Sequence, residues 1–425
     1  MKVYLDTVGC RLNQSEIETF ARQFRGAGHT LVSHAAEADL VVINTCTVTA
    51  AAASDSRQKI RQAARAGAGR VVATGCWATL EPQSAASLTA VSHVIANTHK
   101  DKLVSELLQI PQDTFYLEPL EREPLPGTRA RTRAFIKVQD GCDNRCTFCI
   151  TTVARGPGRS RTTQEVLADI QAALANRQGA QEIVLTGVHL GSWGQDLFPA
   201  SGLYSLVWAI LQETDAPRVR LSSLEPWQLN REFFELWENP RLCRHLHLPL
   251  QSGSVATLRR MARKTTPGEF SALVSEARDM IPGLAVTTDI IVGFPGEDEK
   301  EFTQSLAFVQ EMNFAGGHVF TYSARAGTAA ARMPNQVPHR MRKIHSAQMR
   351  EAIAQSSLAY RRSHIGQMLP VLWESATSLG PDSWDMQGLT DNYLRVFAQA
   401  PRHLWNTITA VKLTGLTEEG LLGEI

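Results

Sequence analysis

The sequence lacks long apolar runs and has few cysteines. No apolar run approaches the roughly 18 residues that a membrane-spanning helix requires. The first ten residues, MKVYLDTVGC, show a strand-like alternation and do not resemble a signal peptide. Only seven of the 425 residues are cysteine, and their uneven spacing does not suggest a disulfide framework. We therefore expect a cytoplasmic protein with no membrane partner, whose cysteines bind metal.

Net charge is also almost absent, because 43 Lys and Arg residues balance 42 Asp and Glu residues. Bulk charge thus gives no reason to expect a polyanionic partner. Between residues 129 and 161, however, eight basic residues stand against two acidic ones. A solvated basic face is the simplest explanation for such a run. Because the run surrounds a cysteine motif, a phosphate-bearing substrate is the better explanation. The candidate RNA-binding residues are Arg129, Arg131, Arg133, Arg155, Arg159 and Arg161.

That motif is DGCDNRCTFCI, in which Cys142, Cys146 and Cys149 form a C-x3-C-x2-C pattern. Three cysteines are one fewer than the four thiolates that a cubane iron–sulfur cluster normally binds. A cluster held by three thiolates leaves one iron open to another ligand, as a catalytic zinc site does. The alternative is a closed zinc site completed by a distant His or Cys.

The other cysteines follow strands near the amino terminus. We predict strands at 3–8, 40–44, 70–74 and 93–96, separated by helices such as 15–24 and 54–64, hence a parallel α/β sheet. Cys10, Cys46 and Cys76 directly follow the first three strands. Ligands bind at the carboxyl edge of such sheets, so a second three-cysteine cluster is expected there. The alternative is that these cysteines only pack in the core. Cys243 has no companion and is interpreted as a packing residue.

The pattern predicts an α/β protein of three domains. Residues 1–111 form the first domain, and 112–132, rich in Pro, Glu and Arg, form a linker. Residues 133–363 alternate strands and helices as in a partial (βα)6 barrel, with strands at 135–138, 182–186, 218–221, 245–250, 284–292 and 318–322. Within it, Thr162 and Glu165 form a capping box for a helix at 163–175, and a long helix covers 338–363. Residues 364–425 form a small β-barrel.

The last domain has no excess of basic residues. From Tyr360 onward there are five Lys and Arg residues against seven Asp and Glu residues. If this domain binds RNA, it does so by shape and through aromatic side chains. The candidates are Trp373, Trp384, Tyr393 and Trp405, and core packing explains them equally well.

The CDNRCTFC segment, with Phe148 before its third cysteine, resembles the radical S-adenosylmethionine (SAM) enzymes. The whole chain resembles their methylthiotransferase branch, whose amino-terminal cysteines lie in GC-x-x-N, NTC-x-V and TGC motifs. Here these motifs are GCRLN, NTCTV and TGCWA. GLTDNYLRV resembles the core of the TRAM domain, a carboxyl-terminal RNA-binding β-barrel.

The resemblance implies two [4Fe–4S] clusters. Cys142, Cys146 and Cys149 would hold the cluster that binds SAM and yields a 5′-deoxyadenosyl radical. Cys10, Cys46 and Cys76 would hold an auxiliary cluster at which the methylthio group is assembled. Phe148 would lie near the adenine, Thr186 and Gly187 would bind the methionine amino group, and Glu225 would bind the ribose. A core Phe, a turn Gly and a surface Glu are the alternatives. An electron donor and a sulfur donor, both of unknown identity, are also implied.

Three subfamilies of this branch differ in substrate. LTGVHLGSWGQDL and RLSSLEPWQL resemble the type that acts on N6-threonylcarbamoyladenosine at position 37 of tRNA, in the anticodon loop. This implies 2-methylthio transfer with two SAM molecules, one as methyl donor and one as radical source. Polar candidates for the substrate pocket are His189, Ser192, Ser222, Ser223 and Gln228. The alternatives are a tRNA with N6-isopentenyladenosine, an aspartate of a ribosomal protein, or an iron–sulfur RNA-binding or electron-transfer protein without turnover.

Overall fold

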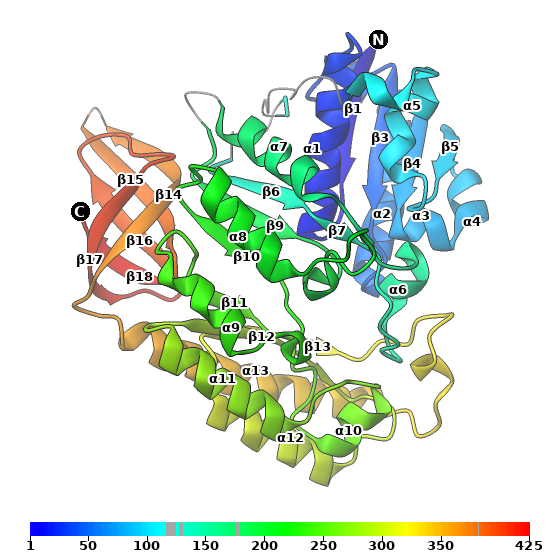
Figure 1. Cartoon of the computed structure of the whole chain (residues 1–425). Coiled ribbons are helices and arrows are strands. Elements are labelled where there is room, and N and C mark those ends of the chain that lie inside the picture. The colour runs from blue at the N-terminus through cyan, green and yellow to red at the C-terminus, as the bar shows by residue number, and fades with distance from the viewer. Residues whose placement is uncertain (116–124, 127–130, 176–178, 381) are drawn as a thin grey trace.

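The computed structural model describes residues 1–115, 125–126, 131–175, 179–380 and 382–425 (Figure 1). Most of the predicted linker lies outside this part of the chain, and the domain boundaries given above stay predictions. Among the described residues, no helix is both long and apolar enough to cross a membrane. In Figure 1 the amino-terminal domain (blue and cyan) and the carboxyl-terminal barrel (orange and red) lie on different flanks of the middle domain (green and yellow).

The amino-terminal domain is a five-stranded parallel sheet in the order β2-β1-β3-β4-β5. Successive residues of its strands pack on opposite faces: Val42 joins the core under α1, and Val41 joins the core under α2. The near-continuous burial of β3 is typical of a parallel strand covered on both faces. The elements are β1 (Lys2–Thr7), α1 (Arg11–Gly26), β2 (Thr30–Leu31), β3 (Leu40–Thr45), α2 (Ala50–Arg65), β4 (Val71–Gly75), α3 (Cys76–Leu80), α4 (Pro82–Ala86), β5 (Val91–Ile95) and α5 (Leu103–Leu108).

The middle domain contains two three-stranded parallel sheets, β10-β9-β6 and β11-β12-β13. Parallel bridges join Val219 to Leu242 and Ser223 to His247, so the six predicted strands follow one another in chain order. This confirms the partial barrel. Its elements are β6 (Arg133–Lys137), β7 (Gln139–Asp140), α6 (Ile150–Arg155), β8 (Arg159–Ser160), α7 (Thr163–Leu174), β9 (Glu182–Thr186), α8 (Leu203–Glu213), β10 (Val219–Leu221), α9 (Arg231–Phe234), β11 (His245–His247), α10 (Val255–Arg260), α11 (Pro267–Met280), β12 (Ala285–Val292), α12 (Glu299–Met312), β13 (Gly316–Thr321) and α13 (His339–Arg362).

The carboxyl-terminal domain is a closed barrel, as predicted, and its strand order is β14-β15-β16-β18-β17. Its strands are β14 (Met368–Gly380), β15 (Ser383–Thr390), β16 (Arg395–Ala400), β17 (Ile408–Leu416) and β18 (Leu421–Glu424). Trp373 is fully buried in the barrel core, so for this residue the packing alternative holds.

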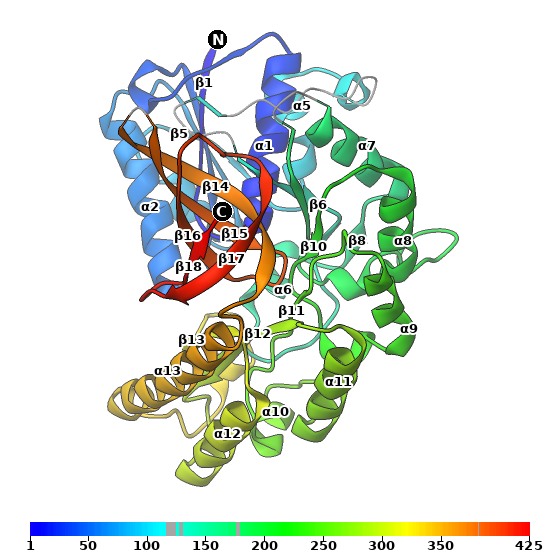
Figure 2. The same cartoon turned by 90° about the vertical axis from the view of Figure 1, so that its left-hand side faces the viewer.

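Tyr393 connects all three domains. Its hydroxyl accepts a hydrogen bond of 2.7 Å from Arg11 of the amino-terminal domain. Its ring stacks on His245 of the middle domain, with 4.2 Å between the ring centroids, and lies 5.2 Å from the Arg220 guanidinium. Figure 2 shows the carboxyl-terminal barrel in front of β1 and α1 from this side. In this structure the Tyr393 side chain is therefore part of the contact between the domains.

Candidate active site

Cys10, Cys46 and Cys76 lie at one edge of the amino-terminal sheet. They follow β1, β3 and β4, which are neighbouring parallel strands, so all three are at the carboxyl edge. Cys10 precedes α1 and is exposed, whereas Cys46 and Cys76 are buried. The predicted convergence of these three loops is confirmed.

Two glycines allow this approach. Gly9 has φ of +102°, and a Cβ atom there would lie 2.7 Å from Cys46 Sγ. Gly75 has φ of +94°, and a Cβ atom there would lie 2.3 Å from the carbonyl oxygen of Thr45. Any side chain at either position would push the cysteine loops apart. The glycines of the GC and TGC motifs thus bring the three cysteines together.

The second set, Cys142, Cys146 and Cys149, lies in the loop between β7 and α6. Gln139 fixes this loop to the end of β9. Its Nε2 donates to the carbonyl oxygens of Asp140 and Gly141, and its Oε1 accepts from the backbone N–H groups of Val188 and His189. Gly141 has φ of +69°, and a Cβ atom there would lie 1.9 Å from the carbonyl oxygen of Pro157. The cysteine loop is therefore held at the carboxyl ends of β6 and β9, where barrel enzymes place their chemistry.

Burial raises the pKa of thiols in both sets. Burial raises the pKa of Cys46 to about 11, and the nearby Cys10 and Cys76 raise it further. Burial also raises the pKa of Cys142 to about 11, against the effect of the Asn144 N–H group that points at its sulfur. Metal binding at either set must consequently displace protons from the thiols.

Free cysteines grouped in threes can hold a single metal ion or an iron–sulfur cluster. All six cysteines of the two sets are free thiols. A zinc ion needs its ligands around one point, whereas a cubane cluster binds each cysteine through a different iron. Either set can therefore supply the three thiolates of a cluster, and metal analysis distinguishes a cluster from a closed zinc site.

The predicted SAM-binding residues surround the second cysteine set. Thr186 ends β9, and its carbonyl oxygen accepts from Val138 N–H at 2.9 Å. Gly187 packs so closely on Gln139 that a Cβ atom would lie 3.1 Å from its side chain. Phe148 is half-buried and makes an edge contact with Phe294, with 6.4 Å between centroids. Core packing therefore accounts for part of the Phe148 environment.

Arg263 is a site residue that the sequence analysis missed. It donates to both carboxylate oxygens of Glu225, at 3.0 and 2.6 Å, and its Nη1 lies 3.8 Å from Cys146 Sγ. The guanidinium also lies 4.6 Å from the centre of the Trp227 ring. Arg263 thus orients Glu225 and brings positive charge to the cysteine loop. Nothing in its local sequence, MARKTT, indicates this, because its partners are 38 and 117 residues away.

The polar residues predicted for the substrate pocket lie beyond β9 and β10. His189 is buried beside Asn144, and burial lowers its pKa, although Glu225 acts in the opposite direction. The imidazole is therefore neutral at pH 7. Gln228 approaches the backbone of Gly191 so closely that no Cβ atom would fit there. Ser222 is buried, and among the described residues its hydroxyl has no hydrogen-bond partner.

The other two serines differ in placement. Ser192 donates to the carbonyl oxygen of His189 at 2.9 Å, so it stabilises the turn that contains that histidine. Ser223 is half-buried and bridges to His247 of the neighbouring strand. The structure thus brings His189, Ser192 and Gln228 together on one side of the cysteine loop, with Ser222 and Ser223 at the adjacent strand end.

The basic residues of 129–161 do not form one free surface. Arg129 lies outside the described residues. Arg131 is exposed and donates to Gln14 at 2.8 Å, whereas Arg133 pairs with Glu374 at 2.6 Å across the contact with the carboxyl-terminal barrel. Arg161 pairs with Asp169 at 2.6 Å, and Arg159 lies 3.4 Å from Asp140.

Arg155 departs most from the prediction. Its side chain is 1% exposed and pairs with Glu16 and Asp140, two buried carboxylates. A guanidinium so enclosed cannot reach a phosphate in this structure. Arg155 is therefore removed from the candidate RNA contacts, because the basic run was counted without the acidic residues that other elements bring to it.

The loop after β13 also spans both cysteine sets. Ala330 N–H donates to the carbonyl oxygen of Thr147, between Cys146 and Cys149, at 2.9 Å. Arg325 donates to the carbonyl oxygen of Thr47, the residue after Cys46. The loop thus contacts both cysteine loops.

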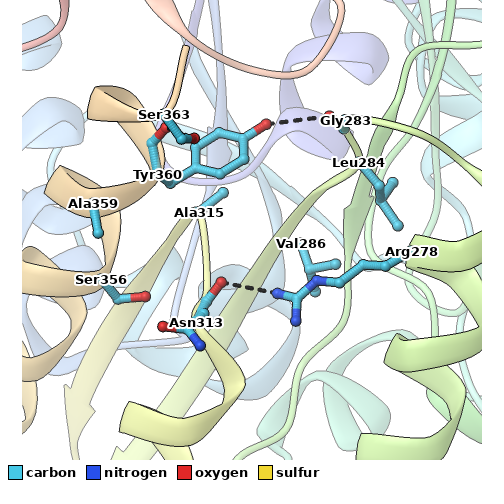
Figure 3. A pocket seen from close by; sticks show the side chains of 10 residues that line it. All are labelled: Arg278, Gly283, Leu284, Val286, Asn313, Ala315, Ser356, Ala359, Tyr360 and Ser363. Atoms are coloured by element: carbon cyan, nitrogen blue, oxygen red, sulfur yellow. Dashed lines mark hydrogen bonds between the residues drawn. The ribbon is translucent and has the colours of Figure 1, made fainter. Parts of the chain in front are cut away.

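A separate pocket of about 360 Å³ lies away from the cysteines (Figure 3). Figure 3 shows two hydrogen bonds at this pocket: Tyr360 donates to the carbonyl oxygen of Gly283, and Arg278 donates to the carbonyl oxygen of Asn313. Gly283 precedes β12 and Asn313 precedes β13, so the pocket lies at the amino ends of these strands. Catalytic groups in βα barrels lie at the opposite ends, so this pocket is not the candidate active site.

Changing Cys142, Cys146 and Cys149 together to alanine is expected to leave about half of the iron, because the other cysteine set would still bind its cluster. Iron and sulfide analysis of anaerobically purified protein measures this. Cys243→Ala is the matched control: Cys243 is buried, with its sulfur 3.7 Å from Glu182, and its loss should not change iron content. Unchanged iron in the triple variant, or zinc in place of iron, would contradict the assignment.

Comparisons with known proteins identify the family of the chain. Residues 2–96 match a family described as Uncharacterized protein family UPF0004, and residues 136–309 match the Radical SAM superfamily. The chain is 34% identical to threonylcarbamoyladenosine tRNA methylthiotransferase MtaB of Bacillus subtilis (strain 168), over 97% of this chain and 93% of that protein. It is 29% identical to tRNA-2-methylthio-N(6)-dimethylallyladenosine synthase of Desulfitobacterium hafniense (strain Y51), over 100% of this chain and 97% of that protein.

Solved structures share the fold at lower identity. The radical S-adenosylmethionine methyltransferase TsrM of Kitasatospora setae superposes with a TM-score of 0.58 at 16% identity, over 75% of this chain and 72% of that one. This likeness concerns the fold alone. Both cysteine sets lie within the two matched family regions, and the curated relatives match nearly the whole length of the chain. The chain therefore belongs to the radical S-adenosylmethionine methylthiotransferase family.

Proposed function

We propose that this protein converts N6-threonylcarbamoyladenosine at position 37 of tRNA to its 2-methylthio derivative. The observation that carries the proposal is the set of polar groups at the carboxyl ends of β9 and β10, above all neutral His189 and the unpartnered hydroxyl of buried Ser222. Threonylcarbamoyl brings a carboxylate and several hydrogen-bonding groups, whereas isopentenyl is apolar. The similarity to relatives named for threonylcarbamoyladenosine supports the same choice.

Two clusters and two SAM molecules complete the proposal. The Cys142 set holds the SAM-binding cluster, and the Cys10 set holds the auxiliary cluster. Bound SAM supplies the radical chemistry that breaks the unactivated carbon–hydrogen bond at adenine C2, and a second SAM supplies the methyl group. An electron donor and a sulfur donor act with the protein in the cytoplasm.

The side chains around the cysteine loop bind and orient. Arg263 holds Glu225 in one orientation, and each Glu225 oxygen keeps a lone pair for a ribose hydroxyl of SAM. In this proposal the carbonyl oxygens of Thr186, which ends β9, and of Gly187 would bind the methionine amino group. The loop after β13, which carries Arg325 and Ala330, contacts both cysteine loops. The target adenine must unstack to enter, which costs a few kcal/mol and less in a single-stranded loop.

Arg129 and Arg131 are expected to contact tRNA phosphates. Changing both to glutamine should weaken tRNA binding and reduce the slope of log K against log salt by about 0.7 to 0.9 per lost contact. Arg133→Gln is the control, because half-buried Arg133 pairs closely with Glu374 at 2.6 Å, whereas Arg131 is exposed and lies 3.8 Å from Glu18. Binding titrations at several salt concentrations measure both slopes. An unchanged slope in the double variant would assign these arginines to a solvated surface.

The experiment that tests the proposed function is nucleoside mass spectrometry. Reconstituted protein, SAM, a reductant and a sulfide source are incubated anaerobically with tRNA that contains N6-threonylcarbamoyladenosine. We expect the 2-methylthio nucleoside at position 37, and none when SAM is omitted. Reaction only with isopentenyladenosine tRNA, or with a ribosomal protein, would reject the substrate and leave the radical chemistry standing.

A further inference from the structure

The carboxyl end of α6 contacts both cysteine sets through three consecutive residues. The carbonyl oxygen of Gly156 accepts from the N–H group of Cys142 at 3.0 Å. The carbonyl oxygen of Ala154 accepts from Asn97 Nδ2 at 2.8 Å, and the same Nδ2 lies 3.6 Å from Cys76 Sγ. This turn of the middle domain thus connects a cysteine loop of its own domain to a cysteine of the amino-terminal domain.

Arg155, between these two residues, makes the third connection. Its Nη2 donates to Asn13 Oδ1 at 2.7 Å, and Asn13 Oδ1 lies 3.8 Å from Cys10 Sγ. Asn13 in turn donates to the carbonyl oxygens of Val8 and Thr45, which precede Cys10 and Cys46. One guanidinium therefore reaches the hydrogen-bond network that shapes the whole amino-terminal cysteine set.

The charge of Arg155 is balanced inside the domain interface. Its Nη1 lies 2.9 Å from Glu16 Oε1 and 2.8 Å from Asp140 Oδ1. Glu16 belongs to α1 and Asp140 directly precedes the second cysteine loop, so the ion pairs cross from one domain to the other. Lys100 also bonds Glu16 at 2.8 Å. Although burial alone would raise the pKa of Glu16, Arg155 and Lys100 hold that pKa well below its usual range.

This network fixes how α1, α6 and the residue before the second cysteine loop lie relative to one another. An arginine satisfies three acceptors on different elements only in one arrangement, because its donors lie in a rigid plane. Breaking a buried ion pair by removing one partner is costly, although Lys100 would still pair with Glu16, and Lys137 and Arg159 would still lie near Asp140. α6 and Arg155 thus connect the two cysteine sets directly.

We propose that Arg155 is a positioning residue that sets the distance and orientation between the two cluster sites. The inference rests on the proposed function, in which radical and methylthio group must reach the same adenine carbon. A misplacement of about 1 Å reduces a rate by about 10²-fold in comparable systems. Loss of Arg155 therefore changes the distance and orientation between the two cluster sites, while each cluster is still bound by its cysteines.

The test compares Arg155→Lys with Arg220→Lys in full-length reconstituted protein. Lysine keeps the charge but cannot reach Glu16, Asp140 and Asn13 at once. Arg220 is the matched control: it is fully buried and paired with Glu182 at 2.7 Å, but it contacts the carboxyl-terminal barrel. Iron content, 5′-deoxyadenosine release, methylthio product and the dipolar interaction between the reduced clusters, measured by pulsed EPR, are recorded for each protein.

We expect Arg155→Lys to keep both clusters and to release 5′-deoxyadenosine, while the product formed per 5′-deoxyadenosine falls by about 10- to 100-fold. The EPR interaction should change in the same variant without any tRNA. Arg220→Lys should leave both quantities at the wild-type value. A wild-type ratio and an unchanged interaction in Arg155→Lys would overturn the inference.

Two further outcomes are also decisive. If Arg155→Lys loses iron, Asp140→Asn and Glu16→Gln, which keep side-chain size, are measured in the same way. Loss of a cluster in all three variants would overturn the inference in favour of a role in assembly. Failure of the proposed function would look different. The wild-type protein itself would then make no methylthio nucleoside. The EPR interaction between the clusters could still be compared between the wild-type protein and the variant, so the inference about Arg155 would still be tested.

Discussion

Replacement of Cys10, Cys46 and Cys76 with alanine is expected to abolish methylthio transfer while SAM cleavage continues. These cysteines share one edge of the amino-terminal sheet. Glu225 and Arg263, which surround SAM in our proposal, lie beside the other cysteine set. The loop that holds Cys142 is fixed by Gln139 and the end of β9 within the middle domain. Its cluster should therefore assemble and react without the auxiliary one.

The measurement is chromatography of 5′-deoxyadenosine together with mass spectrometry of tRNA nucleosides, under anaerobic reducing conditions. The variant lacking Cys142, Cys146 and Cys149 is the matched control, and it should form neither product. Methylthio product at the wild-type level from the variant lacking Cys10, Cys46 and Cys76 would disprove the auxiliary-cluster assignment.

The second large effect concerns substrate choice. We expect kcat/KM for tRNA with threonylcarbamoyladenosine to exceed that for tRNA with isopentenyladenosine by about 10⁴-fold. A site built for hydrogen-bonding groups rejects an apolar analogue strongly, because its own polar atoms are left unpaired. His189 and Ser222 are buried, so water cannot easily replace the missing partners. The two tRNAs are compared in parallel reactions at limiting substrate.

Ser222→Ala refines this comparison. The hydroxyl of Ser222 has no partner among the described residues, so in our proposal it bonds the threonylcarbamoyl group. Removing the hydroxyl should lower kcat/KM for the threonylcarbamoyl substrate by about 10-fold and leave the isopentenyl reaction unchanged. Release of 5′-deoxyadenosine in the absence of tRNA is measured as a control, because a contact between Ser222 and SAM would change it. Equal rates with both tRNAs in the wild-type protein would reject the polar-pocket argument.

Local sequence predicted most elements because their signals are local. The capping box of Thr162 and Glu165 is present, and the strand predicted at 182–186 is β9 (Glu182–Thr186). Cys10, Cys46 and Cys76 lie where they were expected because each closely follows a strand, and parallel neighbours end at one edge. Strand ends and caps depend on a few adjacent residues, which the sequence displays directly.

The roles of single charged residues were harder to predict. Arg155 was assigned to RNA, yet its partner Glu16 is 139 residues away, and Arg133 is paired with Glu374 of the last domain. Arg263 reaches Glu225 and Cys146 only after the barrel has formed. Tyr393 similarly meets Arg11, which is 382 residues away. Such pairings are set by tertiary structure, so a count of charges along the chain does not distinguish an exposed cation from a buried one.

The central claim is that each three-cysteine set binds its own cluster. Iron and acid-labile sulfide, measured per chain in anaerobically purified and reconstituted protein, test it most directly. Two [4Fe–4S] clusters predict about eight iron and about eight sulfide per chain, falling by half when either cysteine set is replaced. About four iron per chain that disappears entirely with the Cys142 set, or zinc at the Cys10 set, would contradict the claim.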